Sequence, residues 1–143
     1  MSMTRRKYLK TMATVAASAG LAERVSAQGR AATPAAARQP IVLHCDLIVD
    51  AAREAEMVRH FNTVVKPAAS KFAGFIDLKM LKLRTTIQGT APARINYRFQ
   101  LTYQTEEQRQ VWVKSDVHTQ VWKGIEDTMV NKKDFQVLLF DSV

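Results

Sequence analysis

Three residues in the second half of the chain have side chains that could carry chemistry. Trp112, His118 and Trp122 fall within one stretch of helical periodicity. A histidine can act as an acid or a base near neutral pH, and an indole can wall an apolar pocket while its N–H donates a hydrogen bond. Two structural interpretations compete: a surface histidine bound to a carboxylate such as Asp116, and tryptophans that only pack between helix and sheet.

A second polar set is expected on two strands. Period-two alternation places five polar residues on one face of the first and third strands: His44, Asp46, Asn96, Arg98 and Gln100. If these strands are neighbours, His44 is a candidate base and Arg98 a candidate oxyanion stabiliser in a polar pocket. The alternative is a wet interface between two sheets, with Asp46 pairing with Arg98 across it.

The remaining reactive residue types give weaker signals. Cys45 is the single cysteine, so no intrachain disulfide is possible, and a buried, inert thiol is expected. Three histidines lie on three separate elements without ligand spacing, and His60 is interpreted as a surface residue. Ser115 and His118 lack a third orienting group for nucleophilic catalysis. No metal and no cofactor are predicted; haem would need an axial histidine, and nothing marks one.

The first 27 residues have the order of an export signal. Residues 4–10 (Thr-Arg-Arg-Lys-Tyr-Leu-Lys) resemble the twin-arginine motif, a weakly apolar stretch covers residues 12–22, and Val-Ser-Ala at 25–27 is a candidate cleavage site. The apolar stretch is too short for a bilayer of about 30 Å, so no membrane anchor is expected after cleavage. A periplasmic or secreted protein is predicted, with residues 28–39 as a flexible linker. The alternative is a basic N-terminal helix of a cytosolic protein.

The net charge of +8 gives little support to nucleic-acid binding. Residues 1–27 carry five basic residues against Glu23 alone, and from Ile41 onward 14 basic residues face 12 acidic ones. A nearly neutral domain offers few contacts for neutralising phosphates. Nucleic acid is therefore not an expected partner.

Residues 40–143 form one expected domain of alternating strand and helix patterns. Residues 41–49 alternate as a strand, and Asp50 is a natural N-cap for a helix over residues 51–72. Its apolar stripe is Met57, Phe61, Val64, Val65, Ala68 and Phe72. Pro67 is expected to kink or end the first part of this helix, and Gly74 to stop it.

The second half repeats this order after a hairpin. Residues 75–84 and 95–103 are expected strands joined by a loop, with Ile76, Leu78 and Met80 on one face of the former. A capping box at residues 105–108 begins a helical region that residues 115–116 interrupt, and residues 135–140 form a last strand.

The predicted order is strand, helix, strand, strand, helix, strand. This is the ferredoxin-like split βαβ pattern of an α+β protein, with an antiparallel sheet and both helices on one face. The other face must meet water or a partner. A homodimer through that sheet face would cover it.

Two segments of the chain resemble a known protein family. Residues 41–83, with Phe-Ala-Gly-Phe at 72–75, resemble the antibiotic biosynthesis monooxygenase-like members of the dimeric α/β-barrel superfamily. Residues 103–122 resemble them too, because an aromatic strand end leads into a helix with Trp112, then Ser115 and His118. The resemblance implies a dimeric α/β barrel, with His118 at the position of the family's helix histidine.

Three functions remain open on this basis. The first is an exported, cofactor-independent monooxygenase that acts on an aromatic or quinone-like small molecule. Its candidate catalytic residues are His118, Trp112, Arg98 and His44, and its candidate pocket residues are Trp122, Tyr97, Tyr103 and Asn96. The second is a non-catalytic protein that binds a small molecule in the same pocket. The third is a structural homodimer whose own side chains fill that space.

Overall fold

Four antiparallel strands form one sheet in the order β2-β3-β1-β4. The computed structural model describes residues 39–92 and 94–143, so the predicted export signal and nearly all of the predicted linker lie outside the described residues. The strands are β1 (Ile41–Leu47), β2 (Phe75–Lys82), β3 (Tyr97–Tyr103) and β4 (Gln136–Asp141). β1 pairs with both β3 and β4, which confirms the predicted adjacency of the first and third strands.

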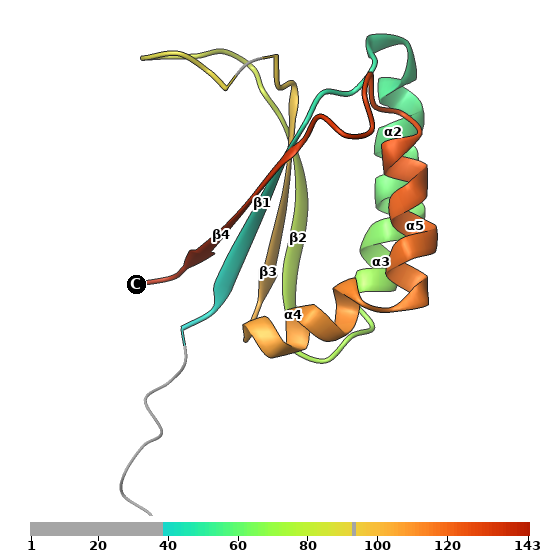
Figure 1. The fold of residues 1–143 in the computed structure, drawn as a ribbon, viewed down its shortest axis with the longest axis vertical. Coiled ribbons are helices and arrows are strands. Elements are labelled where there is room, and N and C mark those ends of the chain that lie inside the picture. The colour runs from blue at the N-terminus through green and yellow to red at the C-terminus, as the bar shows by residue number, and fades with distance from the viewer. Residues whose placement is uncertain (1–38, 93) are drawn as a thin grey trace, which may run out of the picture. The chain divides into compact units, whose positions relative to one another are not determined.

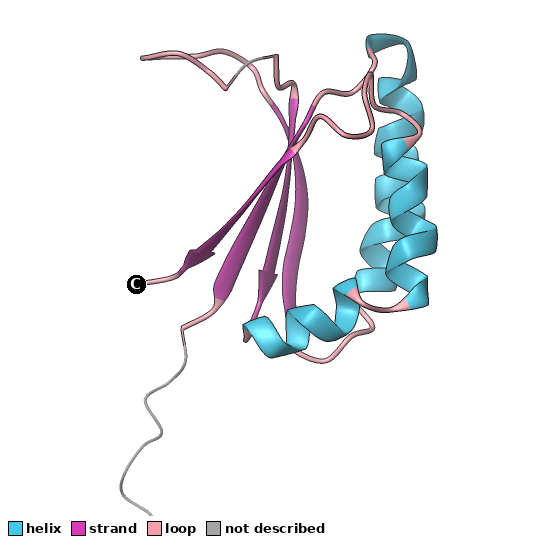
Figure 2. Cartoon of the chain, viewed as in Figure 1, coloured by secondary structure: helices cyan, strands magenta, loops and turns pink. Residues whose placement is uncertain are grey.

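The helices cover one face of this sheet and leave the other bare (Figures 1 and 2). The first helical region joins η1 (Ala51–Arg53), α2 (Glu54–His60), η2 (Phe61–Val65) and α3 (Lys66–Ala69). The second consists of α4 (Glu106–Val113) and α5 (Asp116–Glu126). The order of elements and the one-sided helical layer confirm the predicted ferredoxin-like α+β fold.

The core lies between the helices and the inner face of the sheet, the face that the helices cover. Alternate residues of β1 and β3 point into it, as the period-two pattern predicts: Ile41, Leu43, Cys45, Leu47, Tyr97, Phe99, Leu101 and Tyr103. From the helices, Met57, Trp112 and Ile125 are buried against them. Burial of each large apolar side chain stabilises the fold by about 1.5–3 kcal/mol.

Side-chain caps fix where three helices begin. Asp50 accepts a hydrogen bond from the Ala52 N–H at 2.9 Å, as predicted. Thr105 accepts from the Gln108 N–H at 3.2 Å, but the Gln108 side chain lies 3.4 Å from the Thr105 hydroxyl, so it does not complete the predicted capping box. Ser115 caps α5 by accepting from the His118 N–H at 3.1 Å, which confirms the predicted interruption.

The apolar stripe of the first helical region is shifted by one residue in its second half. Val65 and Ala69 are buried, whereas Val64, which the sequence pattern assigned to the stripe, is exposed. The cause is the π-helical turn η2, in which the Lys66 N–H donates to Phe61 O, five residues back. This wide turn comes directly before Pro67, and the helix continues to Ala69 instead of ending at the proline.

The start of β2 also departs from the sequence pattern. Phe75 pairs with Tyr103 but Asp77 pairs with Thr102, so Ile76 is the extra residue of a β-bulge. Ile76 is exposed, and Phe75 packs against the core in its place. The prediction that Ile76 shares the face of Leu78 is therefore wrong, because period-two alternation does not survive a bulge.

His60 is half-buried between two helices and is not the surface residue that the sequence predicted. Its Nε2 lies 2.8 Å from Val121 O, and a Cβ added at Gly124 would lie 2.2 Å from that same nitrogen. Gly124 thus makes room on α5 for the imidazole of α2. Sequence periodicity missed this contact because it depends on where α5 packs.

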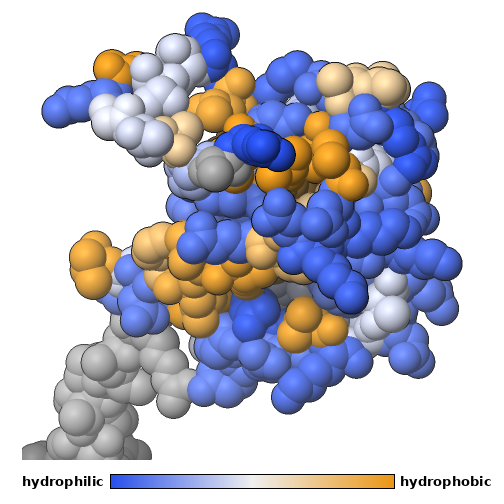
Figure 3. Space-filling view, turned by 45° about the horizontal axis from the view of Figure 1, so that its top comes forward, coloured by the Kyte–Doolittle hydropathy of each residue, from blue (hydrophilic) through white to orange (hydrophobic). Residues whose placement is uncertain are grey.

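β4 forms one edge of the sheet and exposes apolar side chains on both of its faces. Val137, Leu138, Leu139 and Phe140 are 38–50% exposed. Figure 3 shows hydrophobic side chains gathered on the side of the molecule where β4 lies. A large exposed apolar patch is typical of a surface that meets a partner.

Candidate functional site

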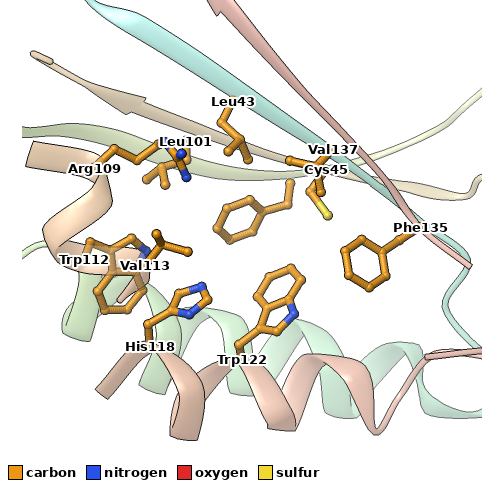
Figure 4. Close-up of a pocket in the computed structure, with 11 residues that line it drawn as sticks. Leu43, Cys45, Leu101, Arg109, Trp112, Val113, His118, Trp122, Phe135 and Val137 are labelled. Atoms are coloured by element: carbon orange, nitrogen blue, oxygen red, sulfur yellow. The ribbon is translucent and has the colours of Figure 1, made fainter. Parts of the chain in front are cut away.

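A cavity of about 210 Å³ lies between the inner face of the sheet and helices α4 and α5. In Figure 4, β1 and β4 carry Leu43, Cys45 and Val137 on one side, and α5 carries His118 and Trp122 on the other. Its apolar lining consists of Leu43, Phe99, Leu101, Val113, Phe135 and Val137. A mostly apolar hollow with a few polar groups is the usual form of a small-molecule site.

Three aromatic rings from the second helical region form one wall of this cavity. The His118 ring stands edge-on to Trp112 with centroids 5.0 Å apart, and stacks on Trp122 at 6.0 Å with an interplanar angle of 8°. Trp112 is further held by Phe72 at 5.0 Å. The helix break at Ser115 lets α4 and α5 each contribute a tryptophan on either side of the histidine.

The ring nitrogens of His118, Trp112 and Trp122 have no hydrogen-bond partner among the residues that the structure describes. Every fully buried side-chain nitrogen or oxygen in the described part of the chain does have one. These ring nitrogens are therefore not fully buried, and the rings that carry them line the cavity. They are candidate hydrogen-bonding groups in a mostly apolar space.

The surroundings of His118 favour the neutral form of its imidazole. Burial lowers the pKa of its imidazole below the ordinary value, and the positive charge of Arg109 lowers it further. A neutral imidazole can accept a proton, which is what a general base must do. The structure brings together the three predicted residues His118, Trp112 and Trp122.

Sequence reasoning missed Arg109, which also lines the cavity. It lies on α4 one turn before Trp112, so the i,i+3 spacing was the available signal. Its side chain is only 12% exposed and binds Glu106 through Nε and Nη2, both at 2.6 Å. This bond lowers the pKa of the Glu106 carboxyl group.

Cys45 lies on the sheet side of the cavity. Burial raises the pKa of its thiol to about 12, and the negative charge of Asp46 acts in the same direction. The thiol is therefore protonated at neutral pH and a weak nucleophile, in line with the inert cysteine predicted from the sequence.

Three of the predicted pocket residues do not line this cavity. Tyr103 is fully buried, its hydroxyl donates to Ala69 O at 3.4 Å, and burial raises its pKa to about 12. Tyr97 lies at the far end of β3 under the 83–96 loop, with Lys82 Nζ 5.8 Å from its ring centre. Asn96 bonds both the N–H and the carbonyl of Val49, which anchors the end of the first strand.

His44 and Arg98, the other two predicted catalytic residues, lie on the outer face of the sheet, away from the helices. Arg98 binds Asp46 through two bonds of 2.6 and 3.0 Å within the same chain. His44 Nε2 lies 3.1 Å from Gln100 Oε1, and its ring is 5.0 Å from that of Phe140. The sheet separates them from His118, so the predicted catalytic residues form two groups.

The described residues contain neither a metal-binding cluster nor a membrane-spanning helix. No group of three or more His, Cys, Asp or Glu side chains in residues 39–92 and 94–143 is placed to hold a metal ion. No helix within the same ranges has the length and apolar character needed to cross a membrane.

Comparison with known proteins gives a structural likeness at low sequence identity. No family model matches the chain, and no curated protein sequence matches it. A dimeric ferredoxin-like protein of unknown function from Jannaschia sp. CCS1 has a TM-score of 0.61 at 10% identity and covers 72% of this chain and 99% of its own.

Two further structural neighbours are named as oxygenases. One is a Caulobacter crescentus protein assigned to antibiotic biosynthesis monooxygenases, with a TM-score of 0.58, 15% identity, and coverage of 75% of this chain and 92% of its own. The other is SnoaB, a cofactor-independent oxygenase from Streptomyces nogalater, with a TM-score of 0.58, 11% identity, and coverage of 73% and 94%. This chain has the ferredoxin-like α+β fold of these proteins.

Proposed function

We propose that this protein is a cofactor-independent monooxygenase that acts on an aromatic or quinone-like small molecule. The observation that carries the proposal is the cavity of about 210 Å³ whose apolar walls include His118 between two tryptophans. SnoaB and the Caulobacter crescentus protein support it as neighbours of the same fold. Fold likeness alone does not determine chemistry, so the site has to carry the argument.

The proposed reaction needs little from the protein beyond binding, deprotonation and exclusion of water. A phenol or hydroquinone reacts with O2 so that one oxygen atom enters a ring carbon, the ring becomes a quinone, and the other atom leaves as water. Neutral His118 takes the hydroxyl proton, which makes the ring electron-rich enough to reduce O2. The indole N–H groups of Trp112 and Trp122 donate to the substrate oxygens.

Oxygen uptake with a panel of hydroquinones and naphthols tests this proposal. Wild-type protein is expected to accelerate uptake over the buffer rate, and His118→Ala to lose about 10²-fold or more, the usual contribution of a general base. Equal rates for the two proteins would remove His118 from the mechanism. Binding of these compounds without any acceleration would favour the second function, a non-catalytic binding protein.

His44→Ala is the matched comparison, because it removes the histidine of the other predicted group. It should leave uptake close to the wild-type rate, since the sheet lies between His44 and the cavity. If His44→Ala lost activity and His118→Ala kept it, the reacting site would be on the outer face.

We also propose that the protein is a homodimer formed through the outer face of the sheet. The dimeric Jannaschia protein supports this, as do the exposed Leu138 and Phe140 beside the half-buried Val42 and His44. Light scattering after gel filtration should give twice the chain mass for wild type and one chain mass for Leu138→Asp. Thr119→Asp, on an exposed part of α5, is the control and should stay dimeric.

We further propose that residues 1–27 direct export and are removed. The twin-arginine pattern in the sequence is the basis. Expression in a bacterium with and without an active twin-arginine pathway, followed by fractionation, tests it. Arg5→Lys with Arg6→Lys should retain the protein in the cytoplasm, and export of that variant would contradict the proposal.

A further inference from the structure

Arg109 brings the single cationic side chain to the lining of the cavity. Figure 4 shows it extending from α4 toward Leu101 on β3, across the end of the cavity where Trp112 lies. Among the eleven residues that line this space, none is acidic. The polar side-chain groups are the guanidinium, the imidazole, two indole N–H groups and the Cys45 thiol, which is protonated.

Glu106 binds this guanidinium from outside the cavity lining and competes with a ligand for its positive charge. It is 35% exposed, whereas Arg109 is 12% exposed, and it does not line the cavity. The two bonds between them use Nε and Nη2, so Nη1 takes part in neither. Glu106 therefore holds the guanidinium plane in place from outside the cavity lining and leaves Nη1 out of this ion pair.

The arrangement favours one kind of polar atom in a ligand. A guanidinium can only donate hydrogen bonds, and the indoles can only donate, so a ligand group that meets Arg109, Trp112 or Trp122 must accept. A mostly buried arginine also binds an anionic oxygen more strongly than a neutral one, because the charge-assisted bond operates in a low dielectric. A cationic ligand would meet the like charge of Arg109, and neutral His118 is the one nitrogen acceptor that this lining offers to a donor.

We infer that Arg109 is the specificity-determining residue of the cavity and that it selects aromatic ligands with an anionic oxygen group, either a carboxylate or a deprotonated phenol. This inference rests on the proposed function, because it names the class of molecule that the same cavity takes. The ring system lies between Trp122, Phe135 and the sheet, and the anionic group lies at the Arg109 end.

Intrinsic tryptophan fluorescence is a direct readout, because both tryptophans of the chain line the cavity. The probes are 2-naphthoate and 2-naphthamide, which have nearly the same shape and differ in charge. Wild-type protein should bind 2-naphthoate at least about tenfold more tightly than 2-naphthamide. In Arg109→Met the two dissociation constants should agree within about twofold, while Arg109→Lys should keep part of the preference because it keeps the charge.

Two further measurements sharpen the result. Glu106→Gln removes the competing carboxylate, so it should tighten 2-naphthoate and leave 2-naphthamide unchanged; the amide thereby reports that the cavity is intact. Binding of 2-naphthol should tighten in wild type, and not in Arg109→Met, across the pH range where the phenol deprotonates. This last arm tells a phenolate preference from a carboxylate preference.

The outcomes separate the two proposals. If both naphthalene probes bind equally well to wild type, the anion inference is overturned and the aromatic cavity stands. If 2-naphthoate is preferred but Arg109→Met keeps that preference, Arg109 is not the selecting residue. If neither probe changes the tryptophan fluorescence while hydroquinones still accelerate oxygen uptake, the anion inference alone is overturned. If no compound of the panel accelerates uptake either, the proposed function fails with it.

Discussion

A histidine and an arginine lie on each side of the sheet, but the two pairs differ in their hydrogen bonding. On the outer face, Arg98 is bound to Asp46 and His44 to Gln100, so these polar groups satisfy one another. On the inner side, the ring nitrogens of His118, Trp112 and Trp122 have no hydrogen-bond partner among the described residues. Arg109 is bound by Glu106, which does not line the cavity.

The difference indicates which face has groups available for a ligand. A polar atom that is not fully buried and has no protein partner can still bind water or a ligand, whereas a satisfied pair must first be broken. The outer face instead combines satisfied polar pairs with the apolar side chains of β4, which suits contact with a protein surface. By residue type alone, His44 and His118 are equal candidates for a base. They differ in hydrogen bonding, because the His44 ring is bonded to Gln100 and the His118 ring has no such partner among the described residues.

The largest expected effect is a loss of stability when Trp112, on the inner side of the sheet, is truncated. Trp112→Ala should lower the free energy of unfolding by about 3–5 kcal/mol, because the side chain is 2% exposed and its removal leaves a void beside Phe72 and His118. Chemical denaturation measures this. Its neighbour Val111 is 65% exposed, so Val111→Ala should change stability by less than about 0.5 kcal/mol. Similar losses in both variants would mean that Trp112 is not packed as described.

A smaller loss of stability is expected when the ion pair on the outer face is broken. Arg98→Met leaves the Asp46 carboxylate, 2% exposed, without its partner, which should cost about 1–3 kcal/mol, toward the low end because Arg98 itself is 35% exposed. The double variant Asp46→Asn, Arg98→Met should recover part of that loss, since no lone charge remains. Binding of 2-naphthoate in the cavity should stay within about twofold of wild type. A large change in binding would show that the two faces are coupled.

The smallest effect concerns the protonation of His118. Its pKa is lowered in the folded protein, so the unfolded chain takes up this proton more readily as the pH falls. The contribution to stability is complete above the ordinary histidine pKa of about 6.5 and is lost as the pH drops through the lower folded-state value. Comparing the unfolding free energy of wild type and His118→Gln between pH 8 and pH 5 measures it. A difference between the two proteins that does not change with pH would contradict the lowered pKa.

Much of the fold was predictable because local chemistry specifies it. Alternation in residues 41–47 and 97–103 identified β1 and β3, and the caps at Asp50 and Ser115 marked helix starts. The departures arise where one residue is inserted into a regular repeat: the π turn before Pro67 and the bulge at Ile76. Each leaves the element in place but moves the buried face, and no sequence period contains that information.

The sequence by itself determined which elements form, their order, and which residues of β1 and β3 share a face. Only the tertiary structure decided which polar residues share a site. It joined His118, Trp112 and Trp122 with Arg109 at one cavity, and placed His44 and Arg98 behind the sheet. The physical reason is that side-chain alternation fixes a face within a strand, whereas the gap between helices and sheet depends on how the two layers pack.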